Sequence, residues 1–401
     1  MEISSRSLSN WNKTNDSLNQ ITITDRIQKF LDRKFRISQS YRTVHTYKNN
    51  IQRFELFSNQ FYNMDLGLLI DRIHDKQIDP LDVLDDFYTH LTKIRPEKSR
   101  KPGYAARTIK SSVITAKEFL NDVGCRIYWE DLKRKFRLPK EPITYQEGLT
   151  KTQISQLIRL ANYKIATAIL IACSSGMRLG EIAQLKLGDI DLEKTPVEIR
   201  IRAETTKTNE GRITHISSQA TRALKDFVAK CPRQKEDYIF LMNYYMQPKK
   251  RYLKSREPAK MSPEELHDYK VQTTEGNLSQ QLWKIIKEIP ELNKKNENGT
   301  NMIHFHAFRY FFKTQVTDAH QSDFAEALMG HKSLKLVYYR QNANARARTY
   351  LDVEHALTIT DTETIDENYS EMQKDNLELR GIVDSLSKQL RNLEKRIEIK
   401  S

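Results

Sequence analysis

The chain of 401 residues is poor in the residue types that mark several classes of protein. Its three cysteines stand far apart and form no Cys-x-x-Cys pair, which argues against a disulfide framework and a zinc site. Apolar runs of membrane-spanning length are missing, and the opening residues MEISSRSLSN lack the apolar centre of a secretory signal. Acidic metal clusters and glycine-rich phosphate loops are missing too. We therefore expect an intracellular protein that uses neither a metal nor a nucleotide cofactor.

Basic residues are in clear excess. Lys and Arg number 66 against 52 Asp and Glu, which gives a formal net charge of +14. Such a surplus favours a polyanionic partner, and nucleic acid is a stronger candidate than an acidic membrane surface. The chain is too long for one ordinary hydrophobic core, so two or three domains are expected.

The amino-terminal part predicts a flexible segment and then a small helical domain. Residues 1–20 are polar and rich in Ser and Asn, as flexible termini often are. Apolar residues recur at helical spacing in 40–57 and 106–124, so we expect an all-helical DNA-binding domain over 21–130. Residues 131–149 carry many Lys and Arg and two prolines without periodicity, which predicts a basic linker. Seven basic residues are expected to contact the DNA backbone: Arg42, Lys48, Arg107, Lys110, Lys133, Arg134 and Lys135.

A second, mostly helical domain is expected over 150–360. Thr150 starts a capping-box pattern, and residues 164–177 are apolar all round, which is typical of a buried helix. Residues 197–216 alternate between apolar and polar side chains around an Asn-Glu-Gly turn and predict a β-hairpin. Residues 245–275 are basic and predict a mobile insertion.

The last residues, 364–401, predict a coiled coil. Leucines recur there at four-three spacing over about three heptads, with Asn376 at a core position, where a polar residue often fixes the register. We expect self-association through residues 372–397. The alternative is a single helix that lies on the protein's own surface.

Several cationic side chains stand at positions where a bound anion would be stabilised. Arg178 follows a Ser-Ser-Gly break at the start of a new helix, whose free N–H groups attract anions. Glu181 either orients this guanidinium or favours the helix start. His306 and Arg309 are three residues apart and share a helix face, where two cations repel unless an anion lies between them. The alternative for this pair is a solvated corner of an amphipathic helix.

The order of the motifs resembles the tyrosine recombinase (phage integrase) family. The matching segments are SGMRLGEI, TKTNEGR, HAFRYFF and LMGHK, followed by YYR, and the resemblance covers roughly residues 21–355. The ARARTYLDVEHALTI ending is more similar to archaeal members. The resemblance implies a mainly α fold with an amino-terminal core-binding (SAM-like) domain and a mixed α/β, mostly helical catalytic domain.

The resemblance also implies a role for each motif residue. A tyrosine hydroxyl attacks a DNA phosphate and leaves a 3′-phosphotyrosyl bond and a free 5′-OH. Arg178 and Arg309 would stabilise the added negative charge of the transition state. His306 would assist proton transfer, Lys207 would protonate the departing 5′ oxygen, and His331 would hydrogen-bond a phosphate oxygen.

The nucleophile departs from the family spacing. Family members usually carry it nine residues after the Gly-His histidine, a position that is Arg340 here. Tyr338 and Tyr339 stand seven and eight residues after His331, and the spacing favours Tyr339, with Tyr338 as the alternative. Tyr350 is expected to pack in the core.

The predicted function is site-specific DNA recombination through a Holliday junction. The enzyme would act as a homotetramer on double-stranded DNA carrying specific sites, in the cytoplasm at the nucleoid of a prokaryote or for a virus. The basic insertion and the coiled coil favour an integrase of a mobile element, such as a virus, plasmid or integrative element. The alternatives are a type IB topoisomerase, a Xer-like chromosome or plasmid dimer resolvase, and a DNA-binding protein that has lost catalysis.

Overall fold

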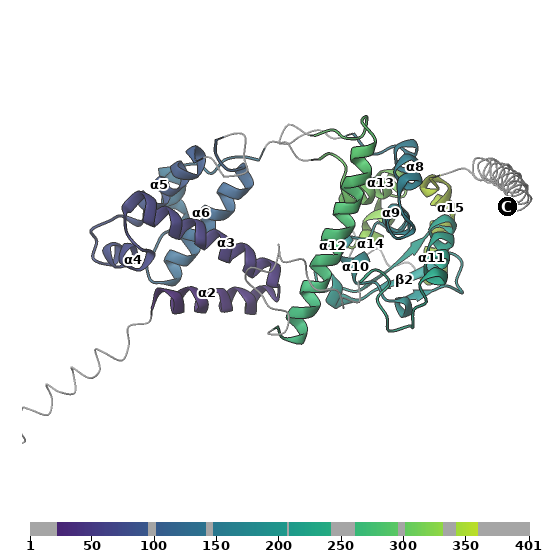
Figure 1. Cartoon of the computed structure of the whole chain (residues 1–401), viewed down its shortest axis with the longest axis horizontal. Coiled ribbons are helices and arrows are strands. Elements are labelled where there is room, and N and C mark those ends of the chain that lie inside the picture. The colour runs from purple at the N-terminus through teal and green to yellow at the C-terminus, as the bar shows by residue number, and fades with distance from the viewer. Residues whose placement is uncertain are drawn as a thin grey trace, which may run out of the picture. The chain divides into compact units, whose positions relative to one another are not determined.

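The structure of the chain is a computed structural model that separates into two compact units, Met1–Thr144 and Tyr145–Ser401 (Figure 1). The residues that it describes are 22–94, 102–141, 147–206, 208–241, 261–295, 301–331 and 342–359. The predicted fold class is confirmed for these residues, since both units are built of helices and the second adds one small sheet. No helix among the described residues is both long and apolar enough to cross a membrane.

The first unit is a helical bundle with a single apolar core. Ile51 and Phe54 of one predicted stripe and Val113 and Leu120 of the other are all buried in it, as the helical spacing requires. The described elements are α2 (Ile23–Ser38), α3 (Tyr41–Phe57), the π-helical turn η1 (Ser58–Tyr62), α4 (Leu66–His74), α5 (Pro80–Lys93), α6 (Ala106–Asp122) and α7 (Trp129–Lys135).

A buried polar contact fixes how α3 packs on α6. The Asn50 amide donates to the hydroxyls of Ser111 (2.9 Å) and Thr115 (3.0 Å). Its carbonyl oxygen accepts hydrogen bonds from Ser112 (3.2 Å) and Arg53 (2.7 Å). Because every polar atom of this side chain has a partner, its burial costs little and favours one register of the two helices.

The boundary predicted at residue 130 is wrong, because α7 continues to Lys135 and belongs to the first unit. Leu132 of α7 is buried in the core of this unit, and Phe136 and Leu138 pack against it. A seven-residue helix makes only two turns, which is too short for its charged sequence WEDLKRK to reveal a period.

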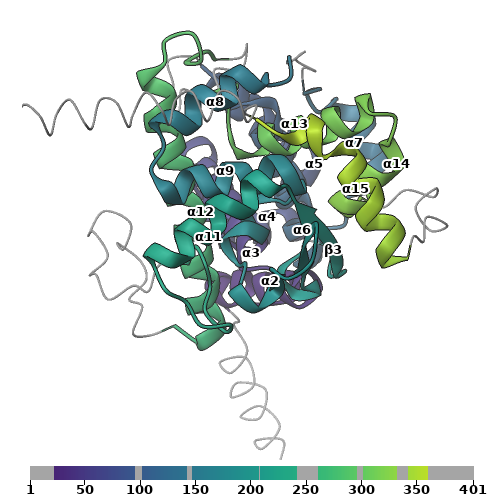
Figure 2. The ribbon, with the colours of Figure 1, turned by 90° about the vertical axis from the view of Figure 1, so that its right-hand side faces the viewer.

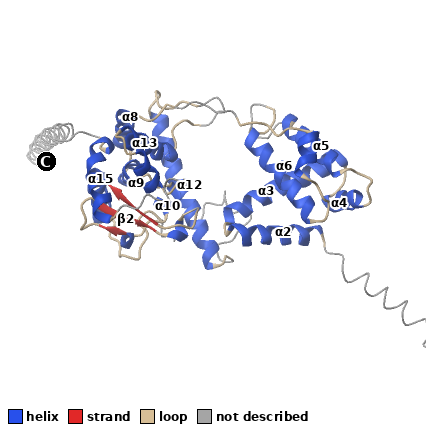
Figure 3. Ribbon diagram, turned by 180° about the vertical axis from the view of Figure 1, so that it is seen from behind, coloured by secondary structure: helices blue, strands red, loops and turns tan. Residues whose placement is uncertain are grey.

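The second unit holds the sheet. Strands β1, β2 and β3 are antiparallel in the order β1-β2-β3, and the predicted hairpin is the pair β2 and β3, with Ile199 opposite Thr214 (Figure 3). The described elements are α8 (Lys151–Leu160), α9 (Tyr163–Ser175), α10 (Leu179–Ala183), η2 (Leu187–Asp189), β1 (Ile190–Asp191), β2 (Val197–Ile201), η3 (Ala203–Thr205), β3 (Arg212–Ile216), α11 (Ser218–Lys230), α12 (Pro263–Glu288), α13 (Phe305–Asp318), α14 (Ser322–Met329) and α15 (Ala343–Leu357).

Helix α9 is the centre of this unit. It is the predicted all-apolar helix, and it packs against α11, α13 and β3. The hydroxyl of Thr150 accepts a hydrogen bond from the backbone N–H of Gln153, so the predicted capping box starts α8. In Figure 2, α15 lies beside β3, where the rings of Tyr350 and His215 are 5.2 Å apart. The elements that carry the motif residues are therefore held by two apolar clusters, to both of which α13 contributes.

Part of the predicted insertion is also helical. Residues 263–275 form the first half of α12, which begins with a capping box between Ser262 and Glu265. The sequence hides this because the segment is charged and its apolar residues are sparse. Residues 245–260 of the predicted insertion, the predicted flexible terminus 1–20 and the predicted coiled coil 364–401 lie outside the described residues.

Candidate active site

Arg178 is the N-cap residue of α10 and stands in the short connection that follows α9. Helix α9 ends at Gly176, whose φ of +65° suits glycine, and a Cβ there would lie 2.5 Å from the Phe312 ring. The backbone N–H of Arg178 donates to Glu181 Oε2 (2.8 Å), and its Nη1 donates to Oε1 (3.0 Å). Glu181 therefore both caps α10 and orients the guanidinium, the two alternatives that the sequence left open.

Arg212 of β3 is a member of this cluster that sequence reasoning missed. Its Nη1 and Nη2 donate to the two carboxylate oxygens of Glu181 at 2.9 and 2.7 Å, and its Nε donates to the Leu328 carbonyl at 2.7 Å. Burial favours a raised pKa for Glu181, but Arg212, and then Arg178, outweigh it and hold that pKa below its ordinary value. Arg212 thus ties the hairpin to α10 and α14.

Arg309 is almost fully buried, with 1% of its surface exposed. It donates to the carbonyls of Gly176 and Met329, the latter at 2.8 Å, and its Nη2 lies 3.0 Å from His331 Nε2. Burial first, and then the charge of Arg178, lower the pKa of Arg309 to about 9, so it stays cationic at neutral pH. Two guanidinium groups are therefore held near each other.

His306 lies one turn before Arg309 on α13 but is exposed. Its ring packs edge-on against Tyr310, with centroids 4.7 Å apart. Partial burial lowers the pKa of His306, and the charges of Arg309 and Arg178 lower it further. At neutral pH the ring is therefore uncharged and able to accept a proton. The structure brings Arg178, His306, Arg309 and His331 together.

One partner of His331, Glu326, and the lysine that holds it, Lys313, were not foreseen from the sequence. Glu326 Oε2 lies 2.5 Å from His331 Nδ1, and Glu326 Oε1 lies 2.5 Å from Lys313 Nζ. Burial favours a raised pKa for Glu326, but Lys313 and then His331 lower it, so the group is a carboxylate. A Glu on a helix, five residues before a His that follows the helix end, gives too weak a sequence signal to be singled out.

Lys207 and the two candidate nucleophiles, Tyr338 and Tyr339, lie outside the described residues. Tyr350 does pack in the core. It is fully buried, its hydroxyl donates to the Ser174 carbonyl (2.7 Å), and burial raises its pKa well above the ordinary value.

The predicted DNA contacts of the first unit are all exposed, on α3, α6 and α7. Those of α7 also have partners within the unit. Lys135 is paired with Asp82, Arg134 lies 3.7 Å from Asp131, and Lys133 lies 5.7 Å from the Trp129 ring. Exposed pairs of this kind are weak and leave these cations available to a polyanion.

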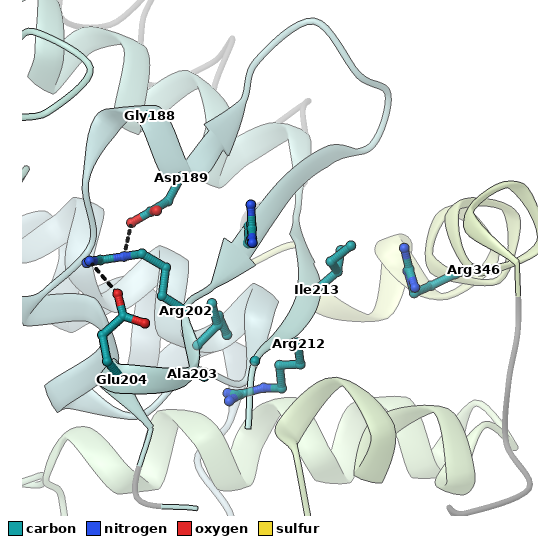
Figure 4. A pocket seen from close by; sticks show the side chains of 11 residues that line it. Gly188, Asp189, Arg202, Ala203, Glu204, Arg212, Ile213 and Arg346 are labelled. Carbon is teal, nitrogen blue, oxygen red and sulfur yellow. Dashed lines mark hydrogen bonds and ion pairs between the residues drawn. The ribbon is translucent and has the colours of Figure 1, made fainter. Parts of the chain in front are cut away.

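A pocket of about 710 Å³ lies beside the hairpin and is lined by four arginines (Figure 4). Arg202 is neutralised there by Asp189 and Glu204, each at 3.1 Å, while Arg212 reaches from the pocket wall to Glu181. Among the described residues, no group of three or more His, Cys, Asp or Glu side chains is arranged to hold a metal ion.

Comparison with known proteins agrees with this arrangement. Residues 147–346 match the model of the phage integrase family. The tyrosine recombinase XerA of Pyrococcus horikoshii is 27% identical over 104 residues, which are 26% of this chain and 35% of that protein. The matched segment therefore spans about a third of the length of this curated relative.

Two solved structures show the same fold. A lambda integrase (75–356) dimer bound to a COC′ core site has a TM-score of 0.52 at 13% identity, over 80% of this chain and 99% of that one. A lambda integrase tetramer bound to a Holliday junction has a TM-score of 0.51 at 12% identity, over 85% and 84%. With its family model, its fold and its ordered motifs, the chain belongs to the tyrosine recombinase (phage integrase) family.

Proposed function

We propose that this protein is a site-specific DNA recombinase that cuts and rejoins DNA through a 3′-phosphotyrosyl intermediate. The observation that carries this proposal is the proximity of Arg178 and Arg309, two guanidiniums that are each held by hydrogen bonds to buried partners. Glu181 compensates part of this positive charge, and because like charges repel at close range, an anion bound between the two guanidiniums would stabilise the cluster further. A phosphodiester offers paired oxygens that suit the planar donors of arginine.

The remaining groups fit the proton transfers of such a reaction. In the proposed step, a tyrosine oxygen forms a bond to phosphorus as the bond from phosphorus to the 5′ oxygen breaks. His306, uncharged at neutral pH, accepts the phenolic proton, and Lys207 donates a proton to the 5′ oxygen. We assign the nucleophile to Tyr339, with Tyr338 as the alternative. The phosphotyrosyl ester retains the bond energy, so the same residues can rejoin the strands.

A nicked suicide DNA duplex tests this proposal. Cleavage releases a short oligonucleotide and traps the enzyme, so wild type should yield a covalent adduct that survives denaturing electrophoresis. Arg178→Ala should reduce the adduct by at least about 100-fold, the cost typical of losing one transition-state donor. The control is Glu193→Ala, because Glu193 is exposed and takes no part in the contacts described for the site. Failure of wild type to form any adduct would contradict the proposal.

The proposed assembly is a homotetramer that holds two duplexes at a Holliday junction. Support comes from lambda integrase, which shares this fold and is seen as a dimer on a core site and as a tetramer on a Holliday junction. We further propose that the protein serves a mobile element and works at the nucleoid. A topoisomerase would instead act as a monomer. Relaxation of supercoiled DNA that lacks any recombination site, without a synaptic complex, would favour that alternative.

A further inference from the structure

The hydrogen-bond partners of His331 determine where its ring carries its proton. An arginine nitrogen can only donate, so His331 Nε2, which lies 3.0 Å from Arg309 Nη2, must be the acceptor. The neutral ring then has its hydrogen on Nδ1, and this N–H points at Glu326 Oε2, 2.5 Å away. A carboxylate can only accept. The two contacts therefore select the same tautomer independently.

Lys313 fixes the carboxylate that makes this contact. Its Nζ lies 2.5 Å from Glu326 Oε1, the oxygen that does not face the histidine. Lys313 comes from α13, the helix of Arg309, whereas Glu326 comes from α14. The carboxylate is thus contacted on both oxygens, by Lys313 of α13 on one side and by His331 on the other.

This tautomer conflicts with the role expected of His331 unless its charge changes. With a lone pair on Nε2, the ring cannot donate a hydrogen bond to a phosphate oxygen. When a phosphate replaces Nε2 as the acceptor of the Arg309 N–H, Nε2 is left facing an anion. A proton from solvent on Nε2 would turn this repulsion into a hydrogen bond, and the imidazolium would then lie between Glu326 and the phosphate.

We propose that Glu326 is a positioning residue that, held by Lys313, fixes the Nδ1–H form of His331 and compensates its positive charge when Nε2 takes up a proton to bind the phosphate. Charged histidine between a carboxylate and an anion is a stable arrangement, because each ring nitrogen donates to an acceptor. The inference rests on the proposed recombinase function but assigns a residue outside its motifs.

Nitrogen NMR of the histidine side chains tests the tautomer without any need for activity. Full-length protein labelled with ¹⁵N-histidine is compared with His331→Gln to assign the ring signals. Wild type without DNA should show a protonated Nδ1 and an unprotonated Nε2, and Glu326→Ala should weaken this preference, because only the Arg309 contact then selects the tautomer. A protonated Nε2 and bare Nδ1 in wild type would overturn the proposal.

Single-turnover cleavage of the suicide duplex tests whether Glu326 contributes to the reaction through His331. Glu326→Ala should slow cleavage by about 10- to 100-fold, as loss of a ring-orienting carboxylate does in other sites, with DNA affinity within twofold of wild type. Glu326→Gln keeps an acceptor for Nδ1 but no charge and should fall between the two. Asp323→Ala, an exposed acidic change on the same helix, is the control.

A double-mutant cycle separates positioning from a merely structural role. If Glu326 acts through His331, adding Glu326→Ala to His331→Gln should slow cleavage by less than about threefold. If the double variant is slowed by the product of the factors found for the two single variants, the proposal is overturned. Cleavage by Glu326→Ala at the wild-type rate would overturn it as well. If wild type itself forms no adduct, the recombinase function fails, and the NMR result still decides the position of the proton.

Discussion

Replacing Arg212 with methionine should destabilise the second unit and leave the first unchanged. The change keeps an unbranched side chain, although a shorter one, and removes both hydrogen bonds to Glu181, whose side chain is 1% exposed, and the one to the Leu328 carbonyl. Leaving one partner of a buried ion pair alone costs about 3–5 kcal/mol. Because Arg178 still contacts the carboxylate at 3.0 Å, we expect the lower end of this range, about 3 kcal/mol.

Amide hydrogen exchange measures this effect unit by unit. A loss of about 3 kcal/mol raises the population of the open state by about a hundredfold, so core amides of α9 and α13 should exchange faster by that factor. Amides of α3 provide an internal control, since neither Arg212 nor Glu181 belongs to the first unit. Arg212→Lys should be intermediate, because an ammonium cannot form the bidentate contact.

A double variant distinguishes the loss of the ion pair from a steric effect of the methionine side chain. In Arg212→Met combined with Glu181→Gln, no buried charge is left unpaired, so protection of α9 should be partly restored. Exchange in α9 and α13 that rises less than about threefold in Arg212→Met would refute the role given to this ion pair. Equal loss of protection in α3 would do so as well.

Three further outcomes follow from the structure. Tyr350→Phe loses the hydrogen bond to Ser174 and should cost about 1 kcal/mol in thermal melts, yet form as much DNA adduct as wild type; loss of the adduct would contradict a packing role. Burial, and then Arg346, lower the pKa of His215, so the unfolded state binds more protons and the free energy of unfolding should fall as the pH drops below about 6.5. His215→Phe should flatten this pH dependence between pH 7 and 5. An unchanged slope would exclude His215 as its source. Deletion of residues 364–401 should spare cleavage and weaken tetramer formation on DNA in native gels, whereas normal assembly and recombination would rule out the coiled coil.

Local patterns were enough to predict many elements. The stripes of α3 and α6, the apolar α9 and the alternating β2 and β3 all have strong periods and lie where expected. Helix α7 was missed because two turns are too short to show a period, and the start of α12 because that segment is charged and its apolar residues are sparse.

The site could be predicted only in part. His306, Arg309 and His331 stand in ordered motifs, and the structure brings them together with Arg178. The residues next to Arg212 and Glu326 in the sequence do not distinguish these two from charged residues that are simply exposed at the surface. Arg212 acquires its role through a partner 31 residues away, and Glu326 through a lysine on another helix. Contacts of this kind are set by how helices and strands pack, which a single sequence does not record in its local spacing.

Peptide mapping of the DNA adduct tests the central claim most directly. Wild-type protein trapped on the suicide duplex would be digested, and the nucleotide-bearing peptide located by mass spectrometry, with Tyr338→Phe and Tyr339→Phe in parallel. The account predicts a phosphotyrosyl bond at Tyr339 that is lost only in Tyr339→Phe. An adduct on Tyr338 would correct the nucleophile, and an adduct on any other residue, or none at all, would contradict the account.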